Sequence, residues 1–145
     1  MEEKDILKEK VRSGFSPCLN NHCELHEHCK RWLGRVFIDK NPLVVETVNL
    51  DNPKVGGNKC VMFSADTKVR MAHGFINLLD RLPRADGQQL FNWLIAHSCR
   101  TYAYEYRNGT RPIPPTLQQL IIDNCRELGW KEDVVFDRYE EDYEW

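Results

Sequence analysis

The chain has 145 residues, of which 41% are hydrophobic and 29% are charged, and its net charge is −2. That length is enough for one ordinary domain with a buried core, and the composition is that of a globular protein. No apolar run approaches the roughly 20 residues that a membrane-spanning helix needs. The first residues mix charges and lack the apolar core of a secretory signal. The sequence therefore predicts a cytoplasmic protein without membrane contact, in a compartment where thiols stay reduced.

The first half of the chain predicts helices around a small β layer. Residues 1–17 form a polar lead-in, with a short helix over 2–11. The next apolar residues follow helical spacing and predict an amphipathic helix over 25–36; they are Leu25, Cys29, Trp32, Leu33 and Val36. The β-branched stretch 43–50 and the apolar run 60–63 predict two short strands, which would need helices to pack against.

The second half predicts three helices. Helical stripes run over residues 69–82 and from Asp86 to the Asn108–Gly109 turn. A third helix begins at Thr116 as N-cap and ends before Gly129. The predicted fold is a single α+β domain over 1–145 with a mainly helical C-terminal half. Its parts are the lead-in (1–17), the cysteine and β part (18–63), the three-helix part (66–130) and an acidic tail (131–145).

A cysteine cluster is the most informative feature of the chain. Cys18, Cys23 and Cys29 lie within twelve residues, and Cys60 follows thirty-one positions later. Four thiolates suit a closed tetrahedral zinc site, and His22 or His28 could replace one of them. The same thiolates could hold an iron–sulfur cluster. A third alternative is that Cys29 and Cys60 are small core residues. We expect zinc, which would pin the N-terminal loop and the helix to the β layer.

The other candidates for chemistry are weaker. Cys99 and Cys125 stand alone on or beside apolar helical faces, which is typical of structural residues. The sequence carries no phosphate-binding loop, dinucleotide fingerprint, nucleophile elbow or H-E-x-x-H motif. An enzyme, metal-dependent or built on an iron–sulfur cluster, is therefore the third functional class in order of preference, after a binding module and a nucleic-acid-binding protein.

The middle of the chain is basic and its end is acidic. Residues 66–112 carry seven bases against four acids, and residues 113–145 carry three bases against nine acids. In the predicted second helix Arg100, Tyr104 and Arg107 share one face, and Arg111 follows. Arginine beside tyrosine suits phosphate contact combined with base stacking. This face is a candidate nucleic-acid-binding surface, which the acidic tail could mask; alternatively, it is simply a solvated surface.

Several phrases together resemble a known family. They are Ser13-Gly-Phe-x-x-Cys18, Cys23 and Cys29 with the following Lys-Arg-Trp, Cys60-x-x-Phe63, Lys68-Val-Arg-Met-Ala-His-Gly-Phe75, Tyr102 to Tyr106, and Arg111-Pro-Ile-Pro-Pro-Thr-Leu-Gln-Gln119. Over roughly residues 11–138 the chain resembles a small uncharacterised family of gut anaerobes, a domain of unknown function. The resemblance implies a bacterial cytosolic protein with the cysteine cluster as a family feature, and it implies no activity.

Taken together, the sequence predicts a non-enzymatic binding or adaptor protein with a structural zinc site. Its expected partner is a protein of unknown identity, and the alternative is a nucleic acid bound by the Arg/Tyr face.

Overall fold

The computed structural model describes residues 2–145, which divide into two compact units. Unit 1 comprises residues 2–67 and 143–145, and unit 2 comprises residues 68–142. Helices and a two-stranded antiparallel sheet make up the regular structure, which confirms the predicted α+β class. In the described part of the chain no helix combines the length and the apolar character needed to span a membrane.

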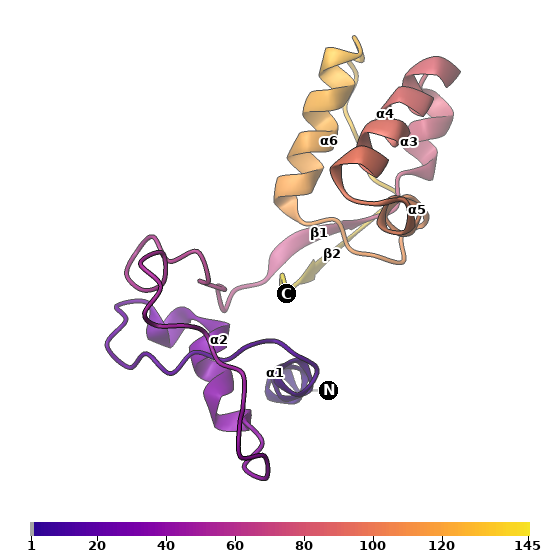
Figure 1. The fold of residues 1–145 in the computed structure, drawn as a ribbon. Coiled ribbons are helices and arrows are strands. Elements are labelled where there is room, and N and C mark those ends of the chain that lie inside the picture. The colour runs from indigo at the N-terminus through magenta and orange to yellow at the C-terminus, as the bar shows by residue number, and fades with distance from the viewer. Residues whose placement is uncertain (1) are drawn as a thin grey trace. The chain divides into compact units, whose positions relative to one another are not determined.

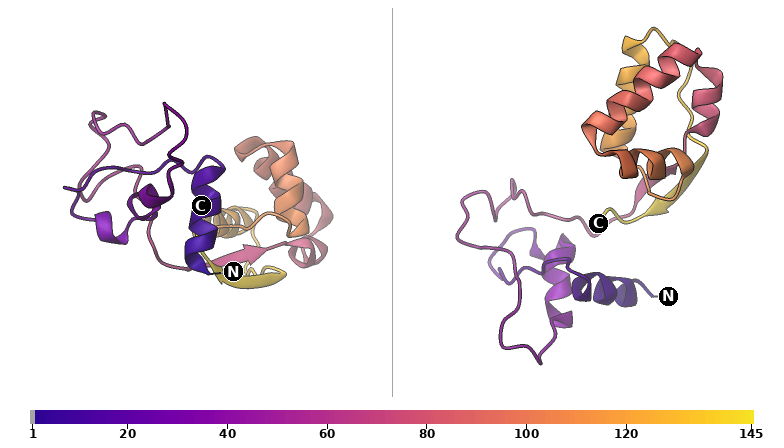
Figure 2. Two further views of the ribbon diagram at one scale, coloured as in Figure 1. Left: turned by 90° about the horizontal axis from the view of Figure 1, so that it is seen from below. Right: turned by 45° about the vertical axis from the view of Figure 1, so that its right-hand side comes forward.

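Unit 1 consists of short helices joined by long irregular segments (Figure 2). Its elements are α1 (Glu3–Arg12), the 3-10 helix η1 (His26–His28), α2 (Lys30–Leu33) and the 3-10 helix η2 (Gly34–Phe37). Helix α1 packs closely on Gly34, where an added Cβ would lie 2.8 Å from Cγ2 of Val11. The prediction of one continuous helix over 25–36 was wrong, because Cys29 is extended (φ −112°, ψ 119°) and pairs with Ala65 as an isolated β-bridge.

The two predicted strands of unit 1 do not form. Residues 43–50 are irregular, and their one backbone link to another segment is the Val48 N–H, which donates to Pro17 O at 2.9 Å. Residues 60–63 lie in turns, where the Cys60 N–H donates to Gly57 O at 3.4 Å. A β-prone segment needs a neighbouring strand to pair with, and neither segment has one. The predicted β layer is therefore absent from this unit.

Unit 2 holds the sheet and four helices (Figure 1). Strand β1 (Val69–His73) pairs antiparallel with β2 (Arg138–Asp142), so that Val69 faces Asp142 and His73 faces Arg138. The helices α3 (Ile76–Arg81), α4 (Arg84–His97), α5 (Arg100–Asn108) and α6 (Pro115–Glu127) gather on one side of this ribbon. The third helix of this half is found as α6, and Gly129 follows it at φ +91°. The predicted N-cap was wrong, because Pro114 is the N-cap residue, no side chain caps the helix, and Thr116 lies within it.

Two predicted helices of unit 2 are interrupted. The stretch 69–82 begins as β1, and Gly74 at φ +79° separates that strand from α3. The long helix predicted from Asp86 divides into α4 and α5, because Cys99 between them is fully extended (φ −164°, ψ 169°). The Cys99 sulfur then accepts the Tyr102 N–H at 3.4 Å and caps α5. Pattern alone did not reveal these breaks, since the apolar spacing continues across both of them.

The hydrophobic core lies in unit 2. Its buried residues come from β1, all four helices and the segments between them; they are Ala72, Phe75, Leu78, Leu82, Leu90, Leu94, Ala103, Ile113, Leu117, Ile121, Cys125 and Phe136. Among residues 2–145, the buried hydrophobic residues that belong to unit 1 are Cys29 and Val48 alone. Unit 2 therefore has an ordinary apolar core, and unit 1 has almost none.

Candidate functional site

The four predicted cysteines lie around one small cavity in unit 1. Cys18, Cys23, Cys29 and Cys60 all line a space of about 20 Å³. A volume of about 10–15 Å³ is enough for one water-sized sphere. The cavity, which nine further residues also line, is therefore large enough for one ion or one water molecule.

Each cysteine comes from a separate piece of backbone. Cys18 lies in the loop after α1, and its N–H donates to Arg31 O at 2.9 Å. Cys23 lies in a turn, and its N–H donates to Asn20 O at 3.5 Å. Cys29 is the residue before α2. Cys60 comes from the turn after Gly57, a glycine at φ +72°. A group bound at all four sulfurs would therefore connect segments that are otherwise linked by few hydrogen bonds.

Arg31 holds the backbone around this cavity, although no motif or spacing in the sequence points to it. Its Nε donates to Met62 O and its Nη1 donates to Ser16 O, both at 2.9 Å. Its guanidinium also lies 4.4 Å from the centroid of the Phe15 ring. One side chain thus ties the segment before Cys18 to the segment after Cys60. A charged residue that bonds backbone carbonyls far apart in sequence leaves no periodic signal.

The other three cysteines lie close enough to Cys18 to affect the pKa of its thiol. Burial is the main cause that raises the pKa of the Cys18 thiol above its ordinary value, and a backbone hydrogen bond involving Asn20 opposes it. Cys29, Cys23 and Cys60 each raise the Cys18 pKa further, because thiolates that are close together repel. Without a cation, Cys18 is therefore protonated at neutral pH.

In this structure the four thiols are not arranged as a metal centre. Within the described range 2–145, no group of three or more His, Cys, Asp or Glu side chains is arranged to hold a metal ion. The donor set suits zinc chemically, since four thiolates make a closed tetrahedral site. Binding would require the sulfurs to close on the cavity that they line, to about 2.3 Å from the ion.

The structure brings a different histidine to the cavity from the two that the sequence suggested. His26 lines it, whereas His22 and His28 do not. The His26 Nδ1–H donates to Cys23 O at 2.6 Å, and its ring meets Trp32 edge-on with centroids 4.4 Å apart. A hydrogen bond at Nδ1 leaves Nε2 as the nitrogen able to bind a metal. His26 is thus the better-placed substitute ligand.

The two remaining cysteines lie in unit 2. Cys125 is fully buried in the core, where burial raises its pKa. Cys99 is exposed and caps α5. Both placements agree with a structural role.

The Arg/Tyr face is formed on α5, but Arg111 is engaged elsewhere. The Arg107 and Arg100 guanidinium carbons lie 4.5 and 6.0 Å from the Tyr104 ring centroid. The Arg111 Nε donates to Glu105 Oε2 at 2.6 Å, and its guanidinium stacks over Tyr102 at 3.7 Å. Hydrogen bonding to Glu105 raises the pKa of Arg111. The face therefore consists of Arg100, Tyr104 and Arg107, and the charge of Arg111 beside it is paired with Glu105.

The acidic tail does not lie free. Residues 138–142 form β2, and Tyr143 to Trp145 belong to unit 1. Lys30, which is only 2% exposed, places its ammonium 4.1 Å from the Trp145 ring centroid and 5.2 Å from that of Tyr143. Lys30 Nζ also donates to Glu144 O. We call this arrangement of Lys30 with residues 143–145 the lysine clamp.

Comparison with known proteins gives a family and no activity. No curated protein and no solved structure shows significant similarity to the chain. One family model matches it over its full length, residues 1–145, and that family is described as one of unknown function. The chain therefore belongs to the family of unknown function DUF6078.

Proposed function

We propose that Cys18, Cys23, Cys29 and Cys60 bind one zinc ion, and that the chain is a non-enzymatic binding module whose unit 1 is stabilised by this ion. The observation that carries the proposal is that four cysteines from separate segments line one cavity large enough for an ion, and that the other three raise the pKa of the Cys18 thiol. Four protein ligands leave no open position for a substrate, which favours a structural site over a catalytic one.

The composition of unit 1 supports a structural role for the ion. A unit of about 70 residues is at the size where a hydrophobic core alone gives little stability. The buried hydrophobic residues that this unit contributes, within the described chain, are Cys29 and Val48. Small domains of this kind use a metal or disulfides in place of a core. Zinc bound at the four sulfurs would join the Cys18 loop, the start of α2 and the Cys60 turn.

The test is to measure zinc content and stability in matched variants. We expect one zinc per chain and no visible absorbance in anaerobically purified protein. Cys23→Ser should release the ion and lower the melting temperature of unit 1. Cys99→Ser is the control, because a serine oxygen can still cap α5. Zinc-free protein with unchanged melting in Cys23→Ser would refute the proposal, and iron with absorbance near ~400 nm would replace zinc with an iron–sulfur cluster.

A second candidate function is nucleic-acid binding by α5. What favours it is that neither Arg100 nor Arg107 takes part in an ion pair within the described residues, so both charges are available to phosphates. Binding to single-stranded probes should fall steeply with salt, and Arg107→Ala should reduce the slope of log K against log salt by about 0.7. Arg84→Ala, on α4, is the control. Binding that is absent, or equal in both variants, would remove this candidate.

A further inference from the structure

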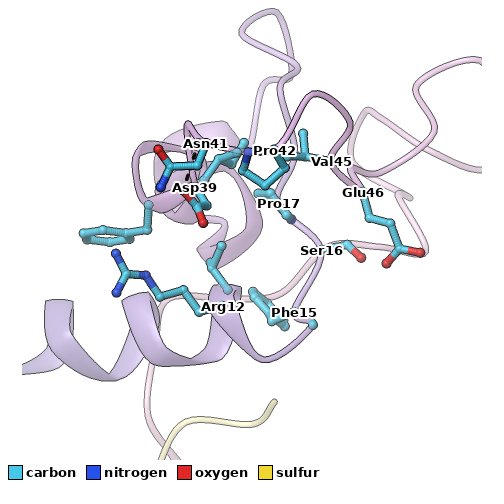
Figure 3. Close-up of a pocket in the computed structure, with 13 residues that line it drawn as sticks. Arg12, Phe15, Ser16, Pro17, Asp39, Asn41, Pro42, Val45 and Glu46 are labelled. Atoms are coloured by element: carbon cyan, nitrogen blue, oxygen red, sulfur yellow. Dashed lines mark hydrogen bonds between the residues drawn. The ribbon is translucent and has the colours of Figure 1, made fainter.

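A second feature of unit 1 is an open groove that shares no residue with the cysteine cavity. It has a volume of about 690 Å³ and runs between the end of α1 and the segment 37–46 (Figure 3). One wall carries Arg12, Phe15 and Pro17, and the other carries Asp39, Pro42 and Glu46. This volume lies within the range of about 300–1,000 Å³ found for ligand sites.

The groove has an apolar middle and charged ends. Phe15, Pro17, Pro42 and Val45 lie along its centre, whereas Arg12 and Asp39 lie toward one end and Glu46 lies at the other (Figure 3). In the part of the chain that the structure describes, none of these three charged side chains takes part in an ion pair. A ligand with an apolar centre and a cationic group at the Glu46 end would therefore complement the groove.

The backbone along one wall is open to pairing. Between residues 43 and 47, among the described residues, no backbone N–H or C=O makes a backbone hydrogen bond. The sequence Leu-Val-Val-Glu-Thr is rich in β-branched residues, which favour strands. A segment with unpaired backbone groups can receive another strand when it takes up an extended conformation, and the alternate side chains of the incoming strand then determine specificity.

Exposure of the same segment indicates a missing contact. Leu43 is 103% exposed and Val44 is 87% exposed, although both are aliphatic. Single exposed aliphatic residues are common, but here they are adjacent, beside a groove and on unpaired backbone. Neither side chain lines the groove, but a strand that pairs with the backbone of residues 43–47 would lie next to both.

We propose that this groove binds an extended peptide segment of a partner protein. The peptide pairs with the backbone of residues 43–47, places apolar or β-branched side chains over Phe15 and Pro42, and directs a lysine or arginine to Glu46. Its opposite end carries a carboxylate or a carbonyl that accepts hydrogen bonds from Arg12. Binding is reversible, and no covalent step is involved.

The experiment is a titration of the ¹⁵N-labelled full chain, as purified, with blocked hexapeptides, followed by NMR. The probes carry aspartate at one end, lysine at the other and alternating valine and threonine between, and both sequence orders are used. One order should shift the amide signals of residues 43–47 at up to millimolar peptide. N-methylation of alternate amides in that peptide should abolish the shifts. If neither order shifts these signals, or if the methylated peptide binds as well, the proposal is overturned.

Charge reversal tests the role of Glu46. Glu46→Lys should weaken binding of the lysine peptide about fivefold and should favour a peptide with glutamate in place of lysine. Asp51→Lys is the matched control, because Asp51 is exposed in unit 1 but does not line the groove. Equal effects of the two variants would overturn the proposal. A second copy of the chain is the competing occupant: a dimer in sedimentation that Val44→Lys converts to a monomer would also overturn it.

Discussion

The lysine clamp gives the sharpest prediction for unit 1. Lys30→Ala removes three buried methylene groups, worth about 2.4 kcal/mol at about 0.8 kcal/mol each. It also removes a charged hydrogen bond to Glu144 O of about 1.5–3 kcal/mol. The cation–π contacts with Trp145 and Tyr143 contribute about 0.5–2 kcal/mol each. Desolvation of the buried ammonium costs several kcal/mol and offsets most of the stabilisation from the hydrogen bond and the cation–π contacts.

The net expectation follows from that balance. Lys30→Ala should lower the unfolding free energy by about 2–4 kcal/mol, mainly through lost packing. Lys30→Met keeps the apolar bulk and removes the charge, so its unfolding free energy should stay within about 1 kcal/mol of wild type. Both variants should change the surroundings of the Trp145 ring, because they remove the ammonium that lies over it, although the ring keeps its contact with Phe15.

Two measurements separate packing from anchoring. Urea unfolding followed by circular dichroism reports stability. ¹⁹F NMR of protein labelled with fluorotryptophan reports the surroundings of Trp145, whose signal is assigned with Trp145→Phe. If Lys30→Met leaves the Trp145 signal unchanged, the cation does not hold the tail. If Lys30→Ala costs less than about 0.5 kcal/mol, the side chain is not buried as the structure shows.

Three further predictions concern the remaining structure. Gly74→Ala should destabilise unit 2 by about 2–4 kcal/mol in urea unfolding, because the position has φ +79° and the new Cβ would lie 2.7 Å from Asp137 Oδ2. Asp137→Ala should cost about 1 kcal/mol, because that carboxylate accepts the N–H groups of Ile76 and Asn77 at 2.9 and 3.0 Å; Asp137→Asn should restore part of the loss. Metal-free protein should lose stability as pH rises above the ordinary thiol pKa of 9.0, because the raised Cys18 pKa makes the folded state hold its proton more tightly than the unfolded state. If the unfolding free energy of the metal-free protein does not change between pH ~8 and ~10, the argument from Cys18 is wrong. If Gly74→Ala lowers the unfolding free energy of unit 2 by less than ~0.5 kcal/mol, the argument from its backbone conformation is wrong.

The sequence predicted helices well where no long-range pairing competed with the local apolar pattern. The helix expected from Thr116 was found as α6, and the lead-in helix was found as α1. A glycine at positive φ follows closely after each helix, Gly14 after α1 and Gly129 after α6, and neither helix competes with a long-range strand pairing. The prediction failed at β1, because the pairing of Val69–His73 with residues 138–142 depends on a contact about 70 positions away. Non-local pairing overrides a helical pattern and leaves no local sign of having done so.

The candidate site also depends on contacts between distant residues, which limits what the sequence can predict. Clustered cysteines indicated which thiols to consider, and the structure places all four around one cavity. Which histidine lies beside them could not be predicted, because it depends on a turn that brings His26 to Cys23 O. The roles of Arg31 and Lys30 were hidden for a related reason. Each acts through contacts with backbone carbonyls far away in sequence, which residue type and spacing do not encode.

Under the zinc binding that we propose, the unequal cores of the two units imply that the units respond differently to loss of the metal. Unit 2 buries a dozen core residues of its own, so its stability does not depend on the cysteines around the cavity. Unit 1 contributes two buried hydrophobic residues, so metal binding would supply much of its folding free energy. Chelation should therefore unfold unit 1 while β1, β2 and the four helices persist. Unfolding of the whole chain would then be non-two-state, and a single cooperative transition for both units after chelation would refute the division of stability argued from their cores.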